Sequence, residues 1–324
     1  MLKVVFMGTP QIAVNSIMKL LNFSDIHIMA IVTQPDRPSG RGKKLMAPPV
    51  KTCAVTNGIP VYQTPSIRKD SELIETLKKL EPDFFITFAF GQILSQEVLD
   101  IPKYATINLH ASLLPKYRGA NPIQRALQNG DKETGITTMI TALALDSGDI
   151  CLQEIIPITE NMTNKDLEEI ISDKSPFLLY RTLKGLVSGA VVPHPQDESE
   201  VTFANKFDKQ DAFLDWNKNA CDIHNHIRCM VDWPCACTKF NGKVVKVLES
   251  RVINDLNCED YTDGEVVDIS KQGVTVRAGG ACILITKVKP ESKGEMSAYD
   301  WSNGAKIKLG DRFECGECEC SLGE

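Results

Sequence analysis

Residues 4–33 are VVFMGTPQIAVNSIMKLLNFSDIHIMAIVT, and the pattern of this stretch decides the fold. Residues 4–7 form a short apolar run that ends at the turn residues Gly8-Thr9-Pro10, as a buried strand does. The next apolar residues recur with helical spacing, and residues 26–33 are again typical of a strand. This order of strand, helix and strand predicts a parallel sheet with helices on its faces.

The same alternation continues to about residue 190. We expect further strands near residue 61 and at residues 84–89, 106–110 and 136–145, and helices at residues 49–57, 71–80, 122–129 and 163–187. A capping box, Thr163-Asn-Lys-Asp166, marks the start of the last helix. The pattern therefore predicts an α/β domain over residues 1–188 with a Rossmann-like, mostly parallel sheet.

The composition and the hydrophobic periodicity change after residue 188. Residues 189–206 are polar and Pro-containing without a helical or strand period, which indicates a linker. Residues 207–313 contain one helical segment and several strand-like runs, two of which flank Asn241-Gly242, a strong hairpin signal. We expect a smaller, mostly β domain here, an open barrel of the OB-like kind that often carries nucleic-acid contacts.

The last residues, 314–324, form an acidic, Cys-rich tail. Cys315, Cys318 and Cys320 would supply three thiolates, whereas a closed zinc site needs four ligands. We therefore expect an acidic tail and no metal site.

Composition excludes several classes of protein. The 324 residues carry a formal charge of −6, which argues against a nonspecific coat on nucleic acid. No apolar run approaches the roughly 20 residues of a membrane helix, and the N-terminal stretch lacks the features of a secretory signal. We expect a cytoplasmic protein that makes no membrane contact, in which most of the eleven cysteines are reduced and buried.

The first strand-to-helix turn, Gly8-Thr9-Pro10, lacks the three glycines of a dinucleotide fingerprint, which disfavours a nicotinamide cofactor. The expected strand at residues 106–110 is more informative. Asn108 and His110 are two residues apart, so their side chains share one face at the carboxyl end of the strand, where open α/β sheets bind ligands. A carboxamide there can stabilise a developing oxyanion, and an imidazole can relay a proton.

A carboxylate that orients the imidazole is expected nearby. The strand predicted at residues 136–145 is followed directly by Asp146. We therefore expect this carboxylate to leave its strand at the same edge of the sheet, beside His110.

This constellation resembles the formyltetrahydrofolate-dependent formyltransferases, in which an Asn, a His and an Asp stand in this order around a Ser-Leu-Leu-Pro loop. The resemblance implies that Asn108, His110 and Asp146 are catalytic and that residues 1–188 are the catalytic domain. It also implies two folate-binding loops, made of Phe88, Ala89, Phe90, Gly91, Gln92, Ile93, Leu94, Ser112, Leu113, Leu114 and Pro115. Members of the family commonly have Tyr at the position of Phe90.

Longer motifs resemble one branch of this family, whose acceptor is the methionine on initiator tRNA. They are FMGTP at 6–10, TQPDRP at 33–38, GRGKKLM at 40–46, PKYRG at 115–119 and LDSGD at 145–149, and the match extends to about residue 313. The resemblance implies transfer of the formyl group of 10-formyltetrahydrofolate to the α-amino group of methionine on initiator methionyl-tRNA, for translation initiation. It implies no metal, a tRNA-binding role for residues 207–313, and a monomer.

A basic segment follows the second expected strand. Residues 34–51 contain five basic side chains and one acidic side chain. Its length and its Pro and Gly residues indicate an inserted loop, and long loops on rigid sheets tend to be functional. In the resembled enzymes the matching loop enters the acceptor end of the tRNA, which implies tRNA contacts at Arg37, Arg41, Lys43 and Lys44, with Arg41 foremost.

Two alternatives stay open. Another folate-dependent formyltransferase or hydrolase, acting on a glycinamide nucleotide, an amino sugar or water, would need neither the basic loop nor the second domain. A non-catalytic RNA-binding protein would use both, but would leave Asn108, His110 and Asp146 unexplained.

Overall fold

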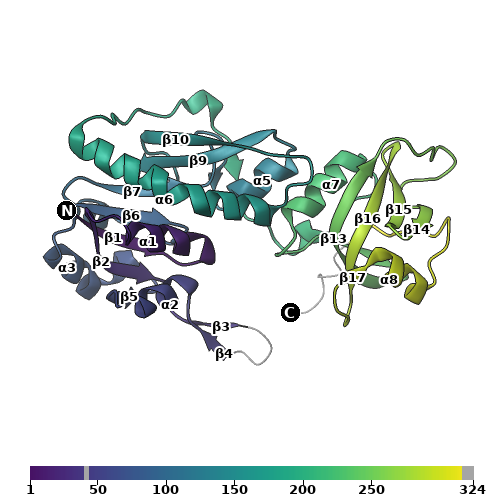
Figure 1. Cartoon of the computed structure of the whole chain (residues 1–324), viewed down its shortest axis with the longest axis horizontal. Helices are drawn as coiled ribbons and strands as arrows, with labels where there is room; N and C mark the ends of the chain where they lie inside the picture. Colours follow the sequence, from purple (N-terminus) through teal and green to yellow (C-terminus); the bar gives the residue numbers. More distant parts are fainter. Residues whose placement is uncertain (40–43, 316–324) are drawn as a thin grey trace. The chain divides into compact units, whose positions relative to one another are not determined.

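A computed structural model describes residues 1–39 and 44–315 of the chain, which divides into two compact units (Figure 1). The first unit contains Met1–Pro122, Thr134–Pro157 and Glu168–Ala204. The second contains Ile123–Glu133, Ile158–Leu167 and the chain from Asn205 onward. Two short segments thus lie with the second unit although they fall inside the predicted catalytic domain, and the limits 1–188 and 207–313 stay predictions. Among the described residues, no helix is long and apolar enough to cross a membrane.

A seven-stranded sheet forms the centre of the first unit, with the strand order β10-β9-β7-β6-β1-β2-β5. The pairs that join β5, β2, β1, β6 and β7 are parallel, and β9 runs antiparallel to β7. This arrangement confirms the predicted α/β fold with a mostly parallel sheet. The strands are β1 Leu2–Gly8, β2 Ile26–Thr33, β5 Val61–Gln63, β6 Phe84–Phe88, β7 Ala105–His110, β9 Glu133–Ile140 and β10 Ile150–Pro157.

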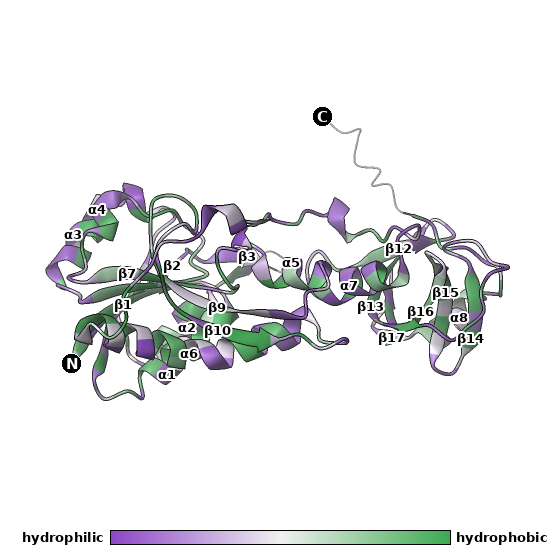
Figure 2. Ribbon diagram, turned by 90° about the horizontal axis from the view of Figure 1, so that it is seen from above, coloured by the Kyte–Doolittle hydropathy of each residue, from purple (hydrophilic) through white to green (hydrophobic). Residues whose placement is uncertain are grey.

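Helices cover both faces of this sheet. Figure 2 shows α1, α2 and α6 on one side and α3 and α4 on the other. Side chains of β1 and β6 that are fully buried, including Val5, Met7 and Phe85, pack with Leu77 of α3 in one hydrophobic cluster. The helices are α1 Val14–Leu20, preceded by a short turn at Gln11–Ala13, α2 Pro49–Thr56, α3 Ser71–Lys79, α4 Gln96–Leu99 and α6 Asn164–Ser188.

The strand order reverses its direction of growth at β1. The chain passes from β1 to β2 on one side of β1 and later returns to β6 on its other side. Open α/β sheets bind ligands beside such a reversal, outside the carboxyl ends of the strands. Because β1, β2, β6 and β7 are parallel, the segments that follow them all start at this edge, which we call the carboxyl edge.

Three segments contain structure that the sequence did not indicate. The strand predicted at residues 136–145 ends at Ile140, and β10 was not predicted. The basic segment is not a plain loop, because β3 Arg37–Ser39 and β4 Lys44–Met46 pair as an antiparallel hairpin. The expected linker is bonded to the first unit, where β11 Phe203–Ala204 pairs with β8 Arg118–Gly119. The sequence of this linker has no strand period, since a two-residue strand shows none.

The second unit is mostly β, as predicted. Its six-stranded sheet has the order β12-β13-β16-β15-β14, with β17 on β16, and these pairs are antiparallel. Asn241 and Gly242 both have positive φ, 50° and 70°, as a type I′ hairpin requires, which confirms the predicted turn. The elements are α5 Pro122–Gln128, α7 Ala220–Cys229, β12 Cys237–Phe240, β13 Lys243–Ile253, β14 Val266–Ser270, β15 Gly273–Ala278, β16 Ala281–Pro290, β17 Met296–Ser297 and α8 Ala298–Ala305.

Aromatic side chains form the core of the second unit. The ring of Phe313 stacks on Trp216 and on Trp301, with centroids 5.6 Å and 5.8 Å apart. Seven of the nine cysteines within the described ranges are buried, which confirms the prediction that most of them pack as small apolar residues. Burial raises the pKa of the Cys151 and Cys229 thiols to about 12, so these thiols are unreactive.

Candidate active site

Asn108 and His110 lie on β7, between β6 and β9. The Thr87 hydroxyl on β6 donates a hydrogen bond of 2.9 Å to Asn108 Oδ1. This bond directs Asn108 Nδ2 away from Thr87, and Nδ2 donates to Asp146 Oδ1 at 3.3 Å. A carboxamide nitrogen carries two protons, so one can bond to Asp146 while the other is directed elsewhere. The carboxamide is therefore held in one orientation by groups on both of its sides.

The His110 imidazole is buried, with 6% of its side chain exposed, and lies between two acceptors. Its Nδ1 is 3.6 Å from Asp146 Oδ2, and its Nε2 is 2.9 Å from the carbonyl oxygen of Tyr117. A neutral ring can donate a proton to one of these acceptors, and a protonated ring can donate to both. Because the Tyr117 carbonyl can only accept, a neutral ring carries its proton on Nε2, and the lone pair of Nδ1 faces the side of Asp146.

Asp146 lies beside His110, although the reason given by the sequence is wrong. Because β9 is antiparallel to β7 and ends at Ile140, it does not deliver Asp146 to the carboxyl edge. The chain instead folds back after Ile140, whose N–H donates to the Asp149 carbonyl at 2.9 Å. A Cβ on Gly148 would lie 1.7 Å from the Ile140 carbonyl oxygen, so this turn accommodates only glycine there.

The Asp146 carboxylate has three neighbours. Oδ1 accepts from Asn108, and Oδ2 accepts the backbone N–H of Gly119 at 2.8 Å and lies near His110. Asp146 has a φ of 48°, in the left-handed region that costs energy for residues other than glycine. The structure thus brings the three predicted catalytic residues together: Asn108 bonds to Asp146, and His110 Nδ1 lies 3.6 Å from the same carboxylate.

Sequence reasoning missed two buried side chains at this turn, Gln196 and Arg118. Gln196 donates to the carbonyl oxygens of Asp146 and Gly148, and it accepts from Arg118. Arg118 stands within the quoted motif at 115–119, but nothing in that motif assigned it a role. Gln196 lies in the segment interpreted as a linker, where no periodicity pointed to a buried residue.

The first predicted folate loop, residues 88–94, leaves β6 at the carboxyl edge. Its side chains alternate in burial: Phe88, Phe90 and Leu94 are buried, whereas Ala89 and Ile93 are exposed. Phe90 belongs to the hydrophobic cluster under the sheet, so the tyrosine hydroxyl common in the family would have to be accommodated there. Between the buried Phe88, Phe90 and Leu94, the exposed residues present backbone groups and apolar surface that a flat ring can contact.

Gln92 anchors this loop to a neighbouring segment. Its Nε2 donates to the Thr64 carbonyl at 2.7 Å, and its Oε1 accepts from the Ile67 N–H at 2.8 Å. Both ends of the carboxamide therefore hold this loop to the segment after β5. Gly91 is exposed and has a φ of 73°.

The second predicted folate loop, Ser112, Leu113, Leu114 and Pro115, continues directly from β7. The Ser112 hydroxyl donates to the Lys116 carbonyl at 2.6 Å, and its own carbonyl accepts from Thr137 Oγ1 at 2.7 Å. Leu114 is buried and its N–H donates to Thr137 Oγ1 at 3.1 Å. Since β6 and β7 are paired with Phe88 opposite Leu109, both predicted folate loops start beside each other and beside His110.

The predicted tRNA contacts are only partly within the described residues. Arg37 and Lys44 are exposed on β3 and β4, and Arg37 donates to Gln34 Oε1. Arg41 and Lys43 lie outside the described residues. Leu45 and Met46 are 70% and 58% exposed, so the hairpin presents apolar as well as basic side chains.

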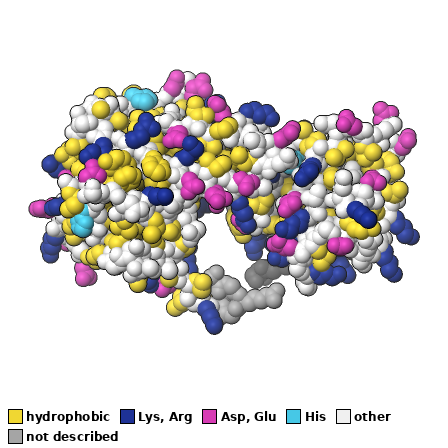
Figure 3. Space-filling view, in the orientation of Figure 1, with side chains coloured by type: hydrophobic (Ala, Val, Ile, Leu, Met, Phe, Trp, Pro, Cys, Tyr) yellow, Lys and Arg dark blue, Asp and Glu magenta, His cyan; other side chains and the backbone are white. Residues whose placement is uncertain are grey.

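Lys51 adds little net positive charge to the basic segment at residues 34–51. It bonds to both carboxylate oxygens of Asp36, at 2.8 Å and 2.9 Å, and this contact is the first cause that holds the pKa of Asp36 below its usual value. Lys51 and Asp36 thus neutralise each other at the base of the hairpin. Figure 3 shows basic and acidic side chains mixed with hydrophobic ones over the visible face of the first unit.

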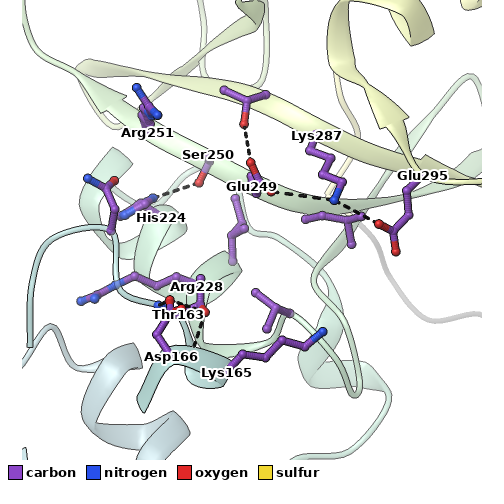
Figure 4. Close-up of a pocket in the computed structure, with 15 residues that line it drawn as sticks. Thr163, Lys165, Asp166, His224, Arg228, Glu249, Ser250, Arg251, Lys287 and Glu295 are labelled. Atoms are coloured by element: carbon purple, nitrogen blue, oxygen red, sulfur yellow. Dashed lines mark hydrogen bonds and ion pairs between the residues drawn. The ribbon is translucent and has the colours of Figure 1, made fainter. Parts of the chain in front are cut away.

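A cavity of about 460 Å³ lies in the second unit, and none of the predicted site residues lines it (Figure 4). Its basic side chains mostly face partners of the protein itself: Lys165 pairs with Asp232, and Lys287 with Glu295. The lining residues are Asn161, Thr163, Lys165, Asp166, His224, Ile227, Arg228, Val231, Leu248, Glu249, Ser250, Arg251, Thr286, Lys287 and Glu295. Since none of them belongs to the group around His110, we place no step of the reaction in this cavity.

His224, which lines this cavity, gives a pH prediction. It contacts Ser250 Oγ and the Glu160 carbonyl, and burial lowers its pKa below the usual 6.5, as burial also does for His226. The unfolded chain therefore takes up protons near pH 6.5, before the folded chain does. The contribution of these neutral imidazoles to the free energy of unfolding should be fully present above pH 6.5 and should be lost as the pH falls below it. Each unit by which folding lowers a pKa corresponds to about 1.4 kcal/mol of this free energy.

Urea midpoints at pH 7.5 and 5.5 measure this effect. His224→Asn should lose less stability between the two pH values than the wild type does. Equal losses in both proteins would contradict the assignment of this pH dependence to His224.

No group of three or more His, Cys, Asp or Glu side chains that could hold a metal ion is found in residues 1–39 and 44–315.

Comparison with known proteins identifies the family. The profile described as "Formyl transferase" matches residues 2–183, and that described as "Formyl transferase, C-terminal domain" matches residues 206–306. The chain therefore belongs to the formyl transferase family. Its curated relatives include methionyl-tRNA formyltransferases: that of Clostridium novyi (strain NT) is 42% identical over 95% of this chain and 98% of its own length. That of Clostridium perfringens (strain 13 / Type A) is 43% identical over 95% and 99%.

Solved structures share this fold at lower identity. The N-formyltransferase from Helicobacter canadensis, in complex with folinic acid and dTDP-3-aminofucose, superposes with a TM-score of 0.65 and 20% sequence identity. The superposition covers 88% of this chain and 99% of that chain.

Proposed function

We propose that this protein transfers the formyl group of 10-formyltetrahydrofolate to the α-amino group of methionine on initiator methionyl-tRNA. The observation that carries the proposal is the cluster at the carboxyl edge in which Asn108 bonds to Asp146 and His110 Nδ1 lies 3.6 Å from the Asp146 carboxylate. The identity of 42% over nearly the full length of a methionyl-tRNA formyltransferase supports the acceptor. The Helicobacter canadensis enzyme, which was solved with folinic acid, supports a folate-derived donor.

The chemistry of formyl transfer explains the residue types. The methionine amine attacks the formyl carbon, a new C–N bond forms, and the formyl oxygen gains negative charge. Asn108 Nδ2 would donate its second proton to this oxygen. His110 Nδ1, the ring nitrogen beside Asp146, would take the proton released by the amine and return it to the folate nitrogen as the bond between that nitrogen and the formyl carbon breaks. His110 therefore has the same number of protons at the end of the reaction as at its start.

We propose that Phe88–Leu94 and Ser112–Pro115 hold the folate. The exposed Ala89, Gly91 and Ile93 offer the contact surface, whereas Phe90 and Gln92 support the loop from beneath. No metal enters this scheme, and we propose that the protein acts as a cytoplasmic monomer.

The acceptor can be tested directly. Purified protein with labelled 10-formyltetrahydrofolate should formylate charged initiator tRNA with a kcat/KM far above that for charged elongator tRNA, a glycinamide nucleotide or a dTDP-linked amino sugar. Transfer to one of the small acceptors and not to the tRNA would favour the alternative function and refute the proposed one.

Arg41, on the predicted tRNA-binding segment, gives a second prediction. Arg41→Ala should raise the KM for tRNA about tenfold and lower the slope of log K against log salt by about 1, as loss of one phosphate contact does. The KM for the folate should not change. Lys19→Ala, which removes an exposed charge from α1, is the matched control. Identical tRNA kinetics for the two variants across a salt series would exclude Arg41 from tRNA binding.

A further inference from the structure

The segment His194–Ala204, interpreted from the sequence as part of a linker, is bonded to the first unit along its length. We call it the strap. At its start His194 forms two backbone hydrogen bonds with Ile150, of 2.8 Å and 3.0 Å. Further along, the Arg118 N–H donates to the Thr202 carbonyl at 2.9 Å. The strap therefore joins the segment after the Asp146 turn to the loop that follows β7.

Gln196 is the side chain of the strap that points into this junction. It is 9% exposed, and its Nε2 donates to the carbonyl oxygens of Asp146 and Gly148, each at 2.8 Å. Its Oε1 accepts from Arg118 Nε at 3.0 Å and from Arg118 Nη2 at 2.8 Å. The carboxamide thus uses both donor protons and both acceptor sites, and only one of its two orientations satisfies all four contacts.

Arg118 connects Gln196 to the other side of His110. Its guanidinium is buried, with 5% of the residue exposed. The preceding residue, Tyr117, places its carbonyl oxygen 2.9 Å from His110 Nε2, and the following residue, Gly119, donates its N–H to Asp146 Oδ2. The contact between Arg118 and Gln196 therefore ties together the two segments that hold the imidazole.

We propose that Gln196 is a positioning residue for the formyl transfer reaction. By binding the Asp146 turn with its nitrogen and Arg118 with its oxygen, it sets the carboxylate and the Tyr117 carbonyl at the two ring nitrogens of His110. The inference rests on the proposed function, because the benefit of this placement is a correctly held proton-transfer group. The left-handed Asp146 backbone needs such support, and inside this buried site water does not readily replace a lost partner.

Gln196→Glu is the sharpest variant. It keeps the shape and an acceptor for Arg118 but removes both protons that bond to the Asp146 and Gly148 carbonyls. We expect kcat to fall roughly 10- to 100-fold, since displacement of a catalytic group by about 1 Å costs this much. The KM values for folate and tRNA should stay within about twofold. Gln196→Met, which removes all four contacts, should lower kcat at least as far, and if it fails to fold the Glu variant decides.

Glu198→Gln is the matched control. Glu198 also bonds to Arg118, at 2.8 Å, but its side chain is 74% exposed. The substitution of Glu198 leaves the contact between Arg118 and Gln196 in place, so kcat should stay within about twofold of the wild type. A fall in kcat for Glu198→Gln as large as that for Gln196→Glu would show that the whole surface of the strap matters and would overturn the specific role of Gln196.

His110 itself provides a readout independent of activity. The chain has only five histidines, so the His110 ring signals can be assigned by comparison with His110→Ala in a long-range ¹H–¹⁵N NMR spectrum. In Gln196→Glu the His110 ¹⁵N shifts should move and report a changed tautomer balance, while those of Glu198→Gln should not. Unmoved His110 signals, with kcat either retained or lowered, would overturn the inference. If the wild type failed to transfer formyl groups but these signals moved, the positioning of His110 would stand and the proposed function would not.

Discussion

Asp146→Asn is expected to lower the rate of formyl transfer by roughly 10²-fold or more while the protein stays folded. Asparagine has nearly the same shape and tolerates the positive φ at this position. It has one acceptor oxygen where Asp146 has two, so it cannot accept from both Asn108 and Gly119, and its NH₂ group faces one of these donors. The negative charge that lies 3.6 Å from His110 Nδ1 is also lost. Steady-state kcat with both substrates saturating measures the effect.

Asp149→Asn is the control for this substitution. Asp149 lies three residues further along the same turn, but its side chain is exposed. It should keep kcat within about threefold of the wild type. Equal losses in the two variants would mean that a general negative charge at the turn matters and would remove Asp146 from its specific place beside His110.

His110→Ala is expected to reduce kcat by roughly 10²-fold or more, because it removes the group that takes up and returns the proton. The KM for the folate should change much less, since the predicted folate loops do not depend on the imidazole for their hydrogen bonds. His27→Ala, at an exposed position of β2, removes an imidazole from the same unit and should leave kcat unchanged. Near-normal turnover of purified His110→Ala would show that proton transfer does not pass through this ring.

The parts of the fold that follow from local patterns were predictable from the sequence. The period of residues 4–33 gives β1, α1 and β2, and Asn241-Gly242 gives the hairpin between β12 and β13, because these signals depend on neighbouring residues alone. Asn108 and His110 were predictable for the same reason, since a strand places residues two apart on one face. The mixed sheet was harder: nothing in residues 133–140 distinguishes a strand that runs antiparallel to β7.

Asp146 shows how a correct expectation can have a wrong basis. The sequence indicated a strand that ended at this residue, whereas the structure delivers it by a turn after Ile140. Gln196, in contrast, was not predicted from the sequence at all. Its place depends on contacts with Asp146, Gly148 and Arg118, which are about 50 to 80 residues away in the chain, and no local pattern encodes them. The least predictable part of the site is therefore the part that holds the catalytic candidates in place.

The most direct test of the central claim is the single-turnover rate of N-formylmethionyl-tRNA formation, measured by rapid quench with enzyme in excess over charged initiator tRNA and with saturating 10-formyltetrahydrofolate. The wild type should form this product. The triple variant Asn108→Ala, His110→Ala, Asp146→Asn should be slowed about as much as the most impaired single variant, because groups that act as a unit lose activity together. A folded triple variant that forms the product at the wild-type rate would contradict the claim that these three residues carry out the transfer.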